Sequence, residues 1–365
     1  MQMLTNDKYE ISATIKKLAD EFVSEQYSGK RYAFGRNEDS EALSKKIILD
    51  GFIDDFAQAG TIWNELPVIK RADVPVDAIV VNCVTSISPV VVDNLLKEQG
   101  LKFFGLYALP HLYPERFVFS SFVKETINNY NANKEKWQEI SDCLEDEISK
   151  AVFNSVLQYR LTGDYNFMSD YKVRIKEQYF EDFLNLKAGE VFVDCGGFDG
   201  DTSEEFIARC PNYEKIYFFE PSETNLLEAK ERLAGKNNIE FIDKGVSDKE
   251  ECLSFSFNGS ASEVSSDGEF TIQTTTIDKY TDKKVTFIKM DLEGWELTAL
   301  KGSENHIKND CPKLAIAVYH KPQDFYEIFE YVKSIQPKYK IYLRHYTQGW
   351  SETVMFFIPS TQEDL

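Results

Sequence analysis

The segment that most constrains the fold of this chain is a glycine-rich turn between an apolar strand and a helix. It reads VFVDCGGFDGDT over residues 191–202. A strand that enters such a turn and continues into a helix is typical of nucleotide-like cofactor sites in open α/β sheets. Gly196 and Gly197 carry no side chain, so neighbouring groups can approach the backbone closely. The turn therefore predicts an α/β sheet with a cofactor at the carboxyl ends of its strands.

The charge of this turn narrows the choice of cofactor. Loops that cradle a pyrophosphate offer bare amides and the positive end of a helix, whereas this loop carries Asp194, Asp199 and Asp201. Three carboxylates would repel a diphosphate but would suit S-adenosylmethionine, which has a sulfonium and an ammonium group and no phosphate. We therefore expect S-adenosylmethionine to bind at the turn, through Asp194, Cys195, Gly196, Gly197, Asp199 and Thr202. An NAD-dependent oxidoreductase with the same kind of turn is the alternative.

Two further motifs follow the next strands. Glu220 and Pro221 end the second strand in FFEP, about 20 residues after the turn, where an acid can hold both ribose hydroxyls of a cofactor. Dinucleotide enzymes use the same device, so this motif fits both cofactors. Ser247, in GVSD (245–248), follows the third strand, where the adenine would lie. An ordinary polar loop explains Ser247 equally well.

Acidic residues and a histidine follow the fourth and fifth strands. Asp291 and Glu293 stand in KMDLEGWE (289–296), and His320 stands in VYHKP (318–322). Because ligands bind at the carboxyl ends of the strands in open α/β sheets, we expect these side chains to form the reaction site, with Asp291 also near the cofactor. The alternative is structural, since acids are favoured at a helix N-terminus by its dipole.

These residues suggest how a methyl group would be transferred. An alcohol is a poor nucleophile near neutral pH, so His320 is predicted to act as the general base while a hydroxyl oxygen attacks the methyl carbon. A divalent metal ion held by Asp291, Glu293 and His320 would be another way to activate the hydroxyl. We do not favour it, and predict no metal ligand, because no tight ligand spacing stands out. A module that binds S-adenosylmethionine without turning it over is a further alternative.

Strand and helix patterns divide the chain into three parts. Residues 1–114 predict a small α/β domain that begins with a helix at 7–26 and has strands at 31–35, 51–55, 78–82 and 101–104. Residues 115–165 predict a helical connector. Residues 166–365 predict a larger α/β domain, with strands at 191–195, 216–220, 239–242, 287–291 and 313–319, an inserted hairpin at 253–257 and 270–275, a helix at 324–335, and final strands at 339–344 and 353–358. A short turn joins the last two strands, which makes them antiparallel.

Composition excludes several partners. The formal net charge is −20, with 61 acidic and 41 basic residues, so the surface repels phosphate backbones and anionic membranes. No apolar run reaches membrane-spanning length. The six cysteines form no C-x-x-C pair, which predicts reduced thiols in a cytoplasmic protein. We therefore expect a small-molecule or saccharide acceptor, and neither a nucleic acid nor a membrane as partner. Formation of a homodimer through the first domain is left open.

Together these motifs resemble the FkbM family of S-adenosylmethionine-dependent methyltransferases, over roughly residues 179–359. The resemblance implies a seven-stranded, Rossmann-like class I methyltransferase sheet that ends in an antiparallel hairpin. It also implies O-methylation of a hydroxyl, often on a sugar, polysaccharide or polyketide-type product. The cofactor contacts it implies are Asp194, Gly196 and Glu220, and the reaction site it implies is Asp291, Glu293 and His320.

The chain departs from the family pattern at two places. Cys195-Gly196-Gly197 replaces the usual Val-Gly-Ala, and Trp295 stands where a small residue is common, so Trp295 would narrow the acceptor pocket. The other residues expected to line that pocket are Tyr179 and His345. The first domain resembles small Rossmann-like modules found before sugar-modifying enzymes, but its loop at 34–40 keeps one glycine. We therefore expect acceptor presentation or dimerisation there rather than dinucleotide binding.

Overall fold

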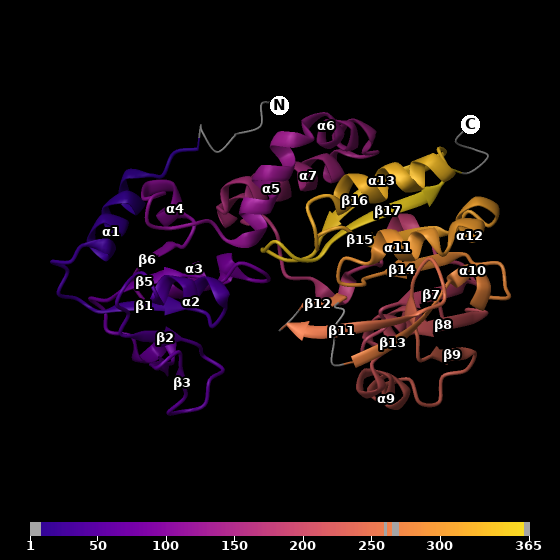
Figure 1. Cartoon of the computed structure of the whole chain (residues 1–365), viewed down its shortest axis with the longest axis horizontal. Coiled ribbons are helices and arrows are strands. Elements are labelled where there is room, and N and C mark those ends of the chain that lie inside the picture. Colours follow the sequence, from indigo (N-terminus) through magenta and orange to yellow (C-terminus); the bar gives the residue numbers. More distant parts are fainter. Residues whose placement is uncertain (1–8, 259–260, 265–269, 361–365) are drawn as a thin grey trace. The chain divides into compact units, whose positions relative to one another are not determined.

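The computed structural model describes residues 9–258, 261–264 and 270–360. The chain forms two compact units (Figure 1). Unit 1 consists of Met1–Ala132, Phe153–Val173 and Thr347–Ser351. Unit 2 consists of Asn133–Val152, Arg174–Tyr346 and Glu352–Leu365. Within the described ranges, none of the helices has both the length and the apolar character needed to cross a bilayer.

Unit 1 contains a six-stranded sheet in the order β3-β4-β2-β1-β5-β6. Its strands are β1 (Arg31–Phe34), β2 (Gly51–Ile53), β3 (Ile62–Trp63), β4 (Leu66–Ile69), β5 (Ile79–Asn82) and β6 (Lys102–Gly105). All neighbours are parallel except the β3–β4 pair. The four strands predicted from sequence are β1, β2, β5 and β6. The short pair β3–β4 was not predicted, because two to four residues give too little alternation to recognise a strand.

Helices accompany this sheet: α1 (Ala13–Val23), α2 (Glu38–Ser44), α3 (Pro89–Glu98), α4 (Ala108–Leu112) and α5 (Ser121–Ala132). The helix predicted at 7–26 is shorter in the structure, because Ser12 caps the backbone N–H of Ile15. Residues 7 and 8 of that prediction lie outside the described residues. The chain continues through α6 (Lys134–Cys143) and α7 (Glu147–Thr162), so the segment without strand patterns is helical.

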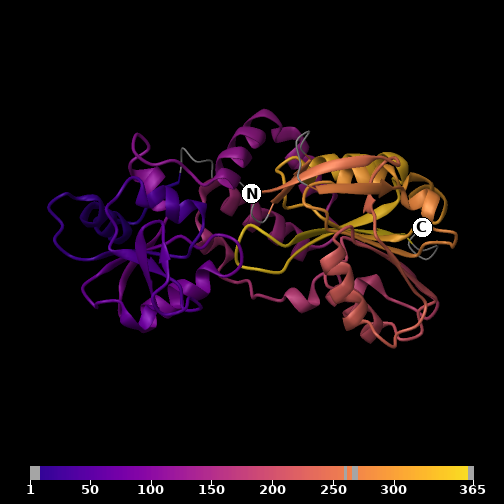
Figure 2. The same cartoon turned by 60° about the horizontal axis from the view of Figure 1, so that its bottom comes forward.

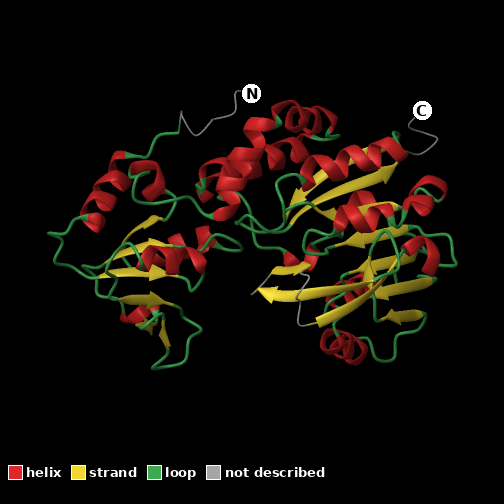
Figure 3. Cartoon of the chain, in the orientation of Figure 1, coloured by secondary structure: helices red, strands yellow, loops and turns green. Residues whose placement is uncertain are grey.

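Unit 2 is built on a seven-stranded sheet in the order β16-β17-β15-β14-β7-β8-β9 (Figure 3). Its strands are β7 (Val191–Cys195), β8 (Lys215–Phe219), β9 (Ile239–Ile242), β14 (Phe287–Met290), β15 (Lys313–Ala317), β16 (Tyr339–His345) and β17 (Thr353–Pro359). β17 lies between β15 and β16 and is antiparallel to both. This is the class I methyltransferase sheet with a terminal antiparallel hairpin, so the predicted fold class is confirmed.

Helices cover both faces of this sheet (Figure 2). α11 (Glu296–Lys301) and α12 (Glu304–Asn309) pack on α13 (Asp324–Ile335), and α8 (Asp201–Arg209) packs on α9 (Glu223–Arg232). A short helix, α10 (Ile277–Tyr280), packs on α12. The predicted helix at 324–335 is therefore confirmed.

A smaller sheet in the order β10-β13-β11-β12 follows β9. Its strands are β10 (Gly245–Val246), β11 (Cys252–Asn258), β12 (Ala261–Val264) and β13 (Phe270–Thr275). β11 and β13 pair antiparallel, which confirms the predicted inserted hairpin. β12 was not predicted, and residues 259–260 and 265–269 lie outside the described residues.

The core of unit 2 fixes the two strands that carry the site. Phe192 of β7 stacks on Phe287 of β14 at 4.9 Å between ring centroids, and on Phe206 of α8 at 4.4 Å. All three side chains are fully buried. Removing one such ring typically costs about 3–5 kcal/mol. This packing holds β7 and β14 together near their amino ends, and the ladder between them continues to Cys195 and Met290 at the carboxyl ends.

Candidate functional site

The glycine turn packs tightly against its neighbours. Gly196 has φ +74°, and a side chain there would overlap the carbonyl oxygen of Asp291. A side chain at Gly197 would overlap the ring of Phe218. The amides of Gly196 and Gly197 both donate to the carbonyl oxygen of Phe219, at 3.0 Å. The two glycines are therefore required by chain packing, and they place the turn directly beside Asp291.

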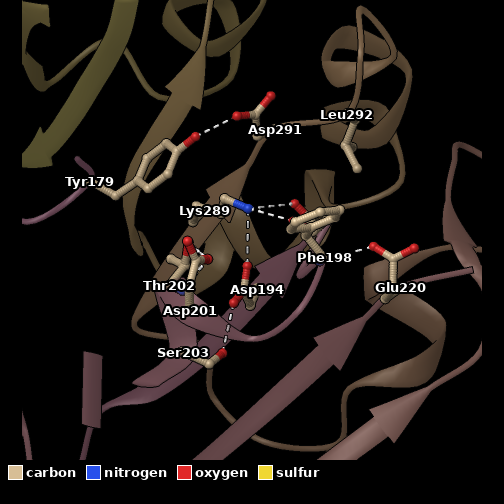
Figure 4. Close-up of polar contacts among 12 residues, drawn as sticks. Tyr179, Asp194, Phe198, Asp201, Thr202, Ser203, Glu220, Lys289, Asp291 and Leu292 are labelled. Atoms are coloured by element: carbon tan, nitrogen blue, oxygen red, sulfur yellow. Dashed lines mark hydrogen bonds and ion pairs between the residues drawn. The ribbon is translucent and has the colours of Figure 1, made fainter. Parts of the chain in front are cut away.

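A buried ion pair packs against the glycine turn and supports it (Figure 4). Lys289 Nζ lies 3.2 Å from Asp194 Oδ1, with 3% and 0% of the two side chains exposed. Ser203 Oγ donates to Asp194 Oδ2 at 2.7 Å, and Lys289 Nζ donates to the carbonyl oxygen of Gly196 at 2.7 Å. Burial alone would lower the pKa of Lys289, but the charges of Asp194 and Asp291 outweigh it and raise that pKa. Asp194 therefore holds the loop through an ion pair that the sequence reasoning missed.

The other loop carboxylates also have partners. Asp199 forms an ion pair with Arg232, whose Nε donates to the carbonyl oxygen of Asp199 at 2.9 Å. Asp201 Oδ1 accepts the backbone N–H of Thr202 at 2.6 Å, in the first turn of α8. Two of the three carboxylates are thus already neutralised by cations. The loop therefore repels a diphosphate less strongly than its sequence indicates.

Glu220 links the end of β8 to the turn. Its Oε2 accepts the backbone N–H of Phe198 at 2.9 Å, and its Oε1 accepts the backbone N–H of Ser222 at 2.9 Å. Only 7% of Glu220 is exposed, and this burial raises its pKa. Phe198 has φ +49° and is 57% exposed. Asn225 Nδ2 also donates to Glu220 Oε1, at 3.4 Å. A carboxylate has about four acceptor sites, so Glu220 retains capacity for about one hydroxyl group of a ligand.

Two predicted cofactor contacts differ in accessibility. Pro221 is partly exposed and follows Glu220 directly. Ser247 is fully buried, and its backbone packs so closely on Gly302 that a side chain at Gly302 would overlap its carbonyl oxygen. The Ser247 hydroxyl donates to Asp248 Oδ1 at 3.3 Å. The side chain of Ser247 is therefore engaged inside the protein.

Asp291 is oriented by two tyrosines. Tyr179 Oη donates to Asp291 Oδ2 at 2.5 Å, and Tyr319 Oη lies 3.3 Å from both carboxylate oxygens. Tyr179 is 5% exposed, so it supports Asp291 from inside rather than forming an open pocket wall. Gln178 Nε2 donates to Tyr179 Oη at 2.8 Å and to Glu352 Oε2 at 2.6 Å. The side chain of Asp291 remains 21% exposed.

His320 lies among three carboxylates. Its Nε2 is 3.4 Å from Asp291 Oδ1 and 3.5 Å from Glu293 Oε2, and its Nδ1 is 3.1 Å from Glu296 Oε1. The structure therefore brings Asp291, Glu293 and His320 together. Burial lowers the pKa of His320, but the close contact and charge of Glu296, together with the charges of Asp291 and Glu293, raise that pKa to about 9. His320 is thus a cation at neutral pH in this state, which weakens the predicted role as general base.

Further acids that the sequence reasoning missed complete this cluster. Glu296 is fully buried, and its Oε1 accepts the backbone N–H of Leu292 at 2.6 Å. Burial and the charge of Glu296 raise the pKa of Asp324 to about 7. Burial and the charge of Asp291 raise the pKa of Glu352 to about 7. Glu296 belongs to the KMDLEGWE motif, so the sequence offered a reason to place it at the site. Glu352 lies beside a hairpin turn and belongs to no motif that would have indicated a role.

Backbone strain is concentrated around this cluster. Among the described residues, nine non-glycine residues have positive φ, and four of them belong to the site: Tyr179, Phe198, Glu293 and Glu352. Each such conformation costs on the order of 1–3 kcal/mol and persists only where the surroundings impose it. Strain of this kind is common at ligand sites, so its position supports the location of the site.

The remaining predicted pocket residues are less accessible than expected. His345 is 2% exposed, and its Nδ1 lies 2.9 Å from Thr353 Oγ1 within the hairpin. Trp295 is partly buried and precedes α11, and its Nε1 has no hydrogen-bond partner among the described residues. Trp295 is therefore the better candidate of the two for contact with an acceptor.

Known proteins resemble this chain in sequence and fold. Residues 194–339 match the family described as Methyltransferase FkbM domain. The crystal structure of Methyltransferase FkbM from Methylobacillus flagellatus KT matches with a TM-score of 0.73 and 23% identity, over 95% of this chain and 94% of that chain. No curated protein matches the sequence.

Other solved structures match about half of the chain. An rRNA methylase from Streptococcus thermophilus matches with a TM-score of 0.34 and 21% identity, over 49% of this chain and 93% of that chain. A putative methyltransferase from Streptococcus mutans in complex with SAH matches with a TM-score of 0.33 and 19% identity, over 48% and 93%. These two scores are too low to support an assignment. Residues 194–339, which lie in the unit built on the seven-stranded sheet, therefore match the FkbM methyltransferase domain, and this match supports a methyltransferase of that kind.

Proposed function

We propose that this methyltransferase uses S-adenosylmethionine to methylate a hydroxyl group of a sugar, polysaccharide or related metabolite. The observation that carries the proposal is the position of Asp291. Its backbone touches the glycine turn at Gly196, and its carboxylate lies 3.4 Å from His320 in a cluster of acids. A cofactor on the turn would therefore face a negatively charged reaction site.

The residues of the site fit this cofactor. Glu220 has free acceptor capacity for a ribose hydroxyl beside the turn, and an acid at the end of this strand holds the ribose in related α/β folds. The negative charge that favours a sulfonium comes from Asp291 and Glu293 more than from the loop, where Asp194 and Asp199 are paired. S-adenosylmethionine supplies an electrophilic methyl carbon when it is bound. NAD would bring a diphosphate to this acidic surface, so we do not favour an oxidoreductase.

The chain's own residues would align and activate the acceptor. Tyr179 and Tyr319 fix the carboxylate of Asp291, which can then accept a hydrogen bond from an acceptor hydroxyl. Alignment of the two reactants can supply about 7–11 kcal/mol of the acceleration. His320 would hold the negative cluster together as an imidazolium, and its role as base would require loss of that proton first. A carboxylate of the cluster is the better acceptor for the hydroxyl proton.

Charge and cysteine state support the remaining expectations. A net charge of −20 disfavours a nucleic acid acceptor. All six cysteines are free thiols, which suits the reducing cytoplasm. A hydroxylated small molecule or saccharide therefore remains the acceptor class that we propose.

The test is transfer of a labelled methyl group from S-adenosylmethionine into a panel of nucleotide sugars, oligosaccharides and cell extracts. Mass spectrometry of the product should locate the methyl group on a hydroxyl oxygen. Asp291→Asn should reduce turnover with the true acceptor at least tenfold, because the oriented carboxylate is lost. Methylation only on nitrogen or carbon would refute the proposed O-methylation.

The matched control is His306→Ala. His306 lies on α12, where its ring contacts Asp310 and Thr281 rather than the cluster. This variant should retain full turnover, whereas His320→Ala should lose it. Equal activity of both histidine variants would remove His320 from the mechanism.

A further inference from the structure

The cluster around His320 has the composition of a metal centre. One ligating atom each from Asp291, Glu296 and His320 lie within 4.8 Å of one another. They come from the end of β14, the start of α11 and the segment after β15, three places that the sheet brings together. Two carboxylates and one imidazole form a mixed oxygen and nitrogen donor set. Such a set suits divalent ions such as Mn²⁺ and Zn²⁺.

A second observation points to a ligand at this place. The side chain of His320 is only 8% exposed. Within the described residues its ring nitrogens contact carboxylate oxygens at 3.1–3.5 Å, but none of these contacts has hydrogen-bond geometry. Oε2 of Glu296 is likewise buried without a hydrogen-bond partner there, on a side chain that is 0% exposed. A buried polar group without a partner costs about 1–3 kcal/mol. Buried donor atoms left in this state are what an ion would satisfy.

We propose that one divalent metal ion binds to one carboxylate oxygen each from Asp291 and Glu296 and to one ring nitrogen of His320. Glu293, at 3.5 Å from His320 and 52% exposed, lies at the open side of the centre. Three protein ligands leave positions open for water or for an acceptor hydroxyl. Resting on the proposed function, the ion would polarise that hydroxyl and ease loss of its proton to a carboxylate.

The site differs from the one that the sequence suggested. There Glu293 was the third ligand, and the spacing gave no reason to favour a metal. In the structure Glu296 replaces it, because one further turn of chain carries Glu296 into the core while Glu293 stays at the surface. Because Glu296 is buried beside His320, its carboxylate can supply the third protein donor atom, together with Asp291 and His320.

Titration of metal-stripped protein with MnCl₂ tests the site directly, with isothermal calorimetry for affinity and pulsed EPR for the ligands. We expect one bound Mn²⁺ per chain and a nitrogen hyperfine coupling from one imidazole. Glu296→Gln and His320→Gln should each weaken binding at least tenfold, and His320→Gln should remove the nitrogen coupling. ZnCl₂ titration provides a second probe with the same expected losses.

The matched control is Glu223→Gln, which changes the same residue type in the first turn of α9, where it is exposed. It should leave Mn²⁺ binding unchanged. Pulsed EPR of the unaltered protein keeps the test valid if Glu296→Gln fails to fold, because bound Mn²⁺ without nitrogen coupling would overturn the site. If neither ion binds at concentrations up to about 1 mM, which corresponds to a very weak affinity, the proposed site is also overturned.

A separate titration with S-adenosylhomocysteine distinguishes this inference from the proposed function. Protein that binds S-adenosylhomocysteine but neither ion refutes only the metal site. Protein that binds Mn²⁺ through His320 but no S-adenosylhomocysteine refutes the proposed function and leaves the metal site standing.

Discussion

Lys289→Met should strongly destabilise unit 2, because Lys289 is the charge partner of the buried Asp194. The two side chains are 3% and 0% exposed and 3.2 Å apart. Removing one partner of a buried ion pair typically costs about 3–5 kcal/mol, since the remaining charge stays in a medium of low polarity. At roughly 2–4 °C per kcal/mol for a unit of this size, the melting temperature should fall by about 6–20 °C.

The assay is thermal unfolding followed by circular dichroism, with and without S-adenosylhomocysteine. The variant should also lose the stabilisation by the ligand, because Lys289 holds the carbonyl oxygen of Gly196 at 2.7 Å. Asp194→Asn combined with Lys289→Met should recover much of the stability, since the unpaired charge is then gone.

Lys215→Met is the matched control. Lys215 forms an ion pair with Glu240 at 2.8 Å, but the two side chains are 24% and 40% exposed. Such a pair contributes on the order of 0–1 kcal/mol. If Lys289→Met costs no more than Lys215→Met, or if the double variant is no more stable than Lys289→Met, the buried ion pair does not support the turn as we describe.

Further outcomes follow from the backbone, the charge and the hydrogen bonds of the site. Gly196→Ala should abolish the thermal shift by S-adenosylhomocysteine, because the added methyl group overlaps the Asp291 carbonyl, whereas Gly235→Ala, with φ +80° and open space around it, should keep that shift. The pKa of His320 is about 9 when folded and 6.5 as its ordinary value, so its contribution of about 3 kcal/mol is present below pH 6.5 and is lost as pH rises to 9. Urea denaturation of metal-stripped protein across this range should show that loss, and His320→Gln should show a flatter profile. Tyr179→Phe removes a 2.5 Å hydrogen bond to Asp291 and should lower kcat more than it changes the affinity for S-adenosylhomocysteine, as steady-state kinetics and calorimetry can show.

Much of the fold could be predicted from sequence, because periodic patterns and turn residues act locally. β7, β8, β9, β14 and the β16–β17 hairpin lie where alternating or apolar runs indicated. Short elements such as β3 and β10 could not be predicted, because two residues carry no period.

The candidate site was predictable only in part. Asp291, Glu293 and His320 come together because the carboxyl ends of adjacent strands share one edge. The partners Lys289 and Glu296 depend on burial and side-chain direction, which spacing along the chain does not reveal. The same limit explains why the loop carboxylates were counted as free charges, and why His320 was expected to be a base.

The most direct test of the account is a pair of crystal structures, one soaked with S-adenosylhomocysteine and one with NAD. We expect S-adenosylhomocysteine above the Gly196 turn, with a ribose hydroxyl on Glu220 and its sulfur facing Asp291, and no NAD at that place. NAD bound at the turn, or S-adenosylhomocysteine bound away from Glu220 and Asp291, would contradict the assignment of this site.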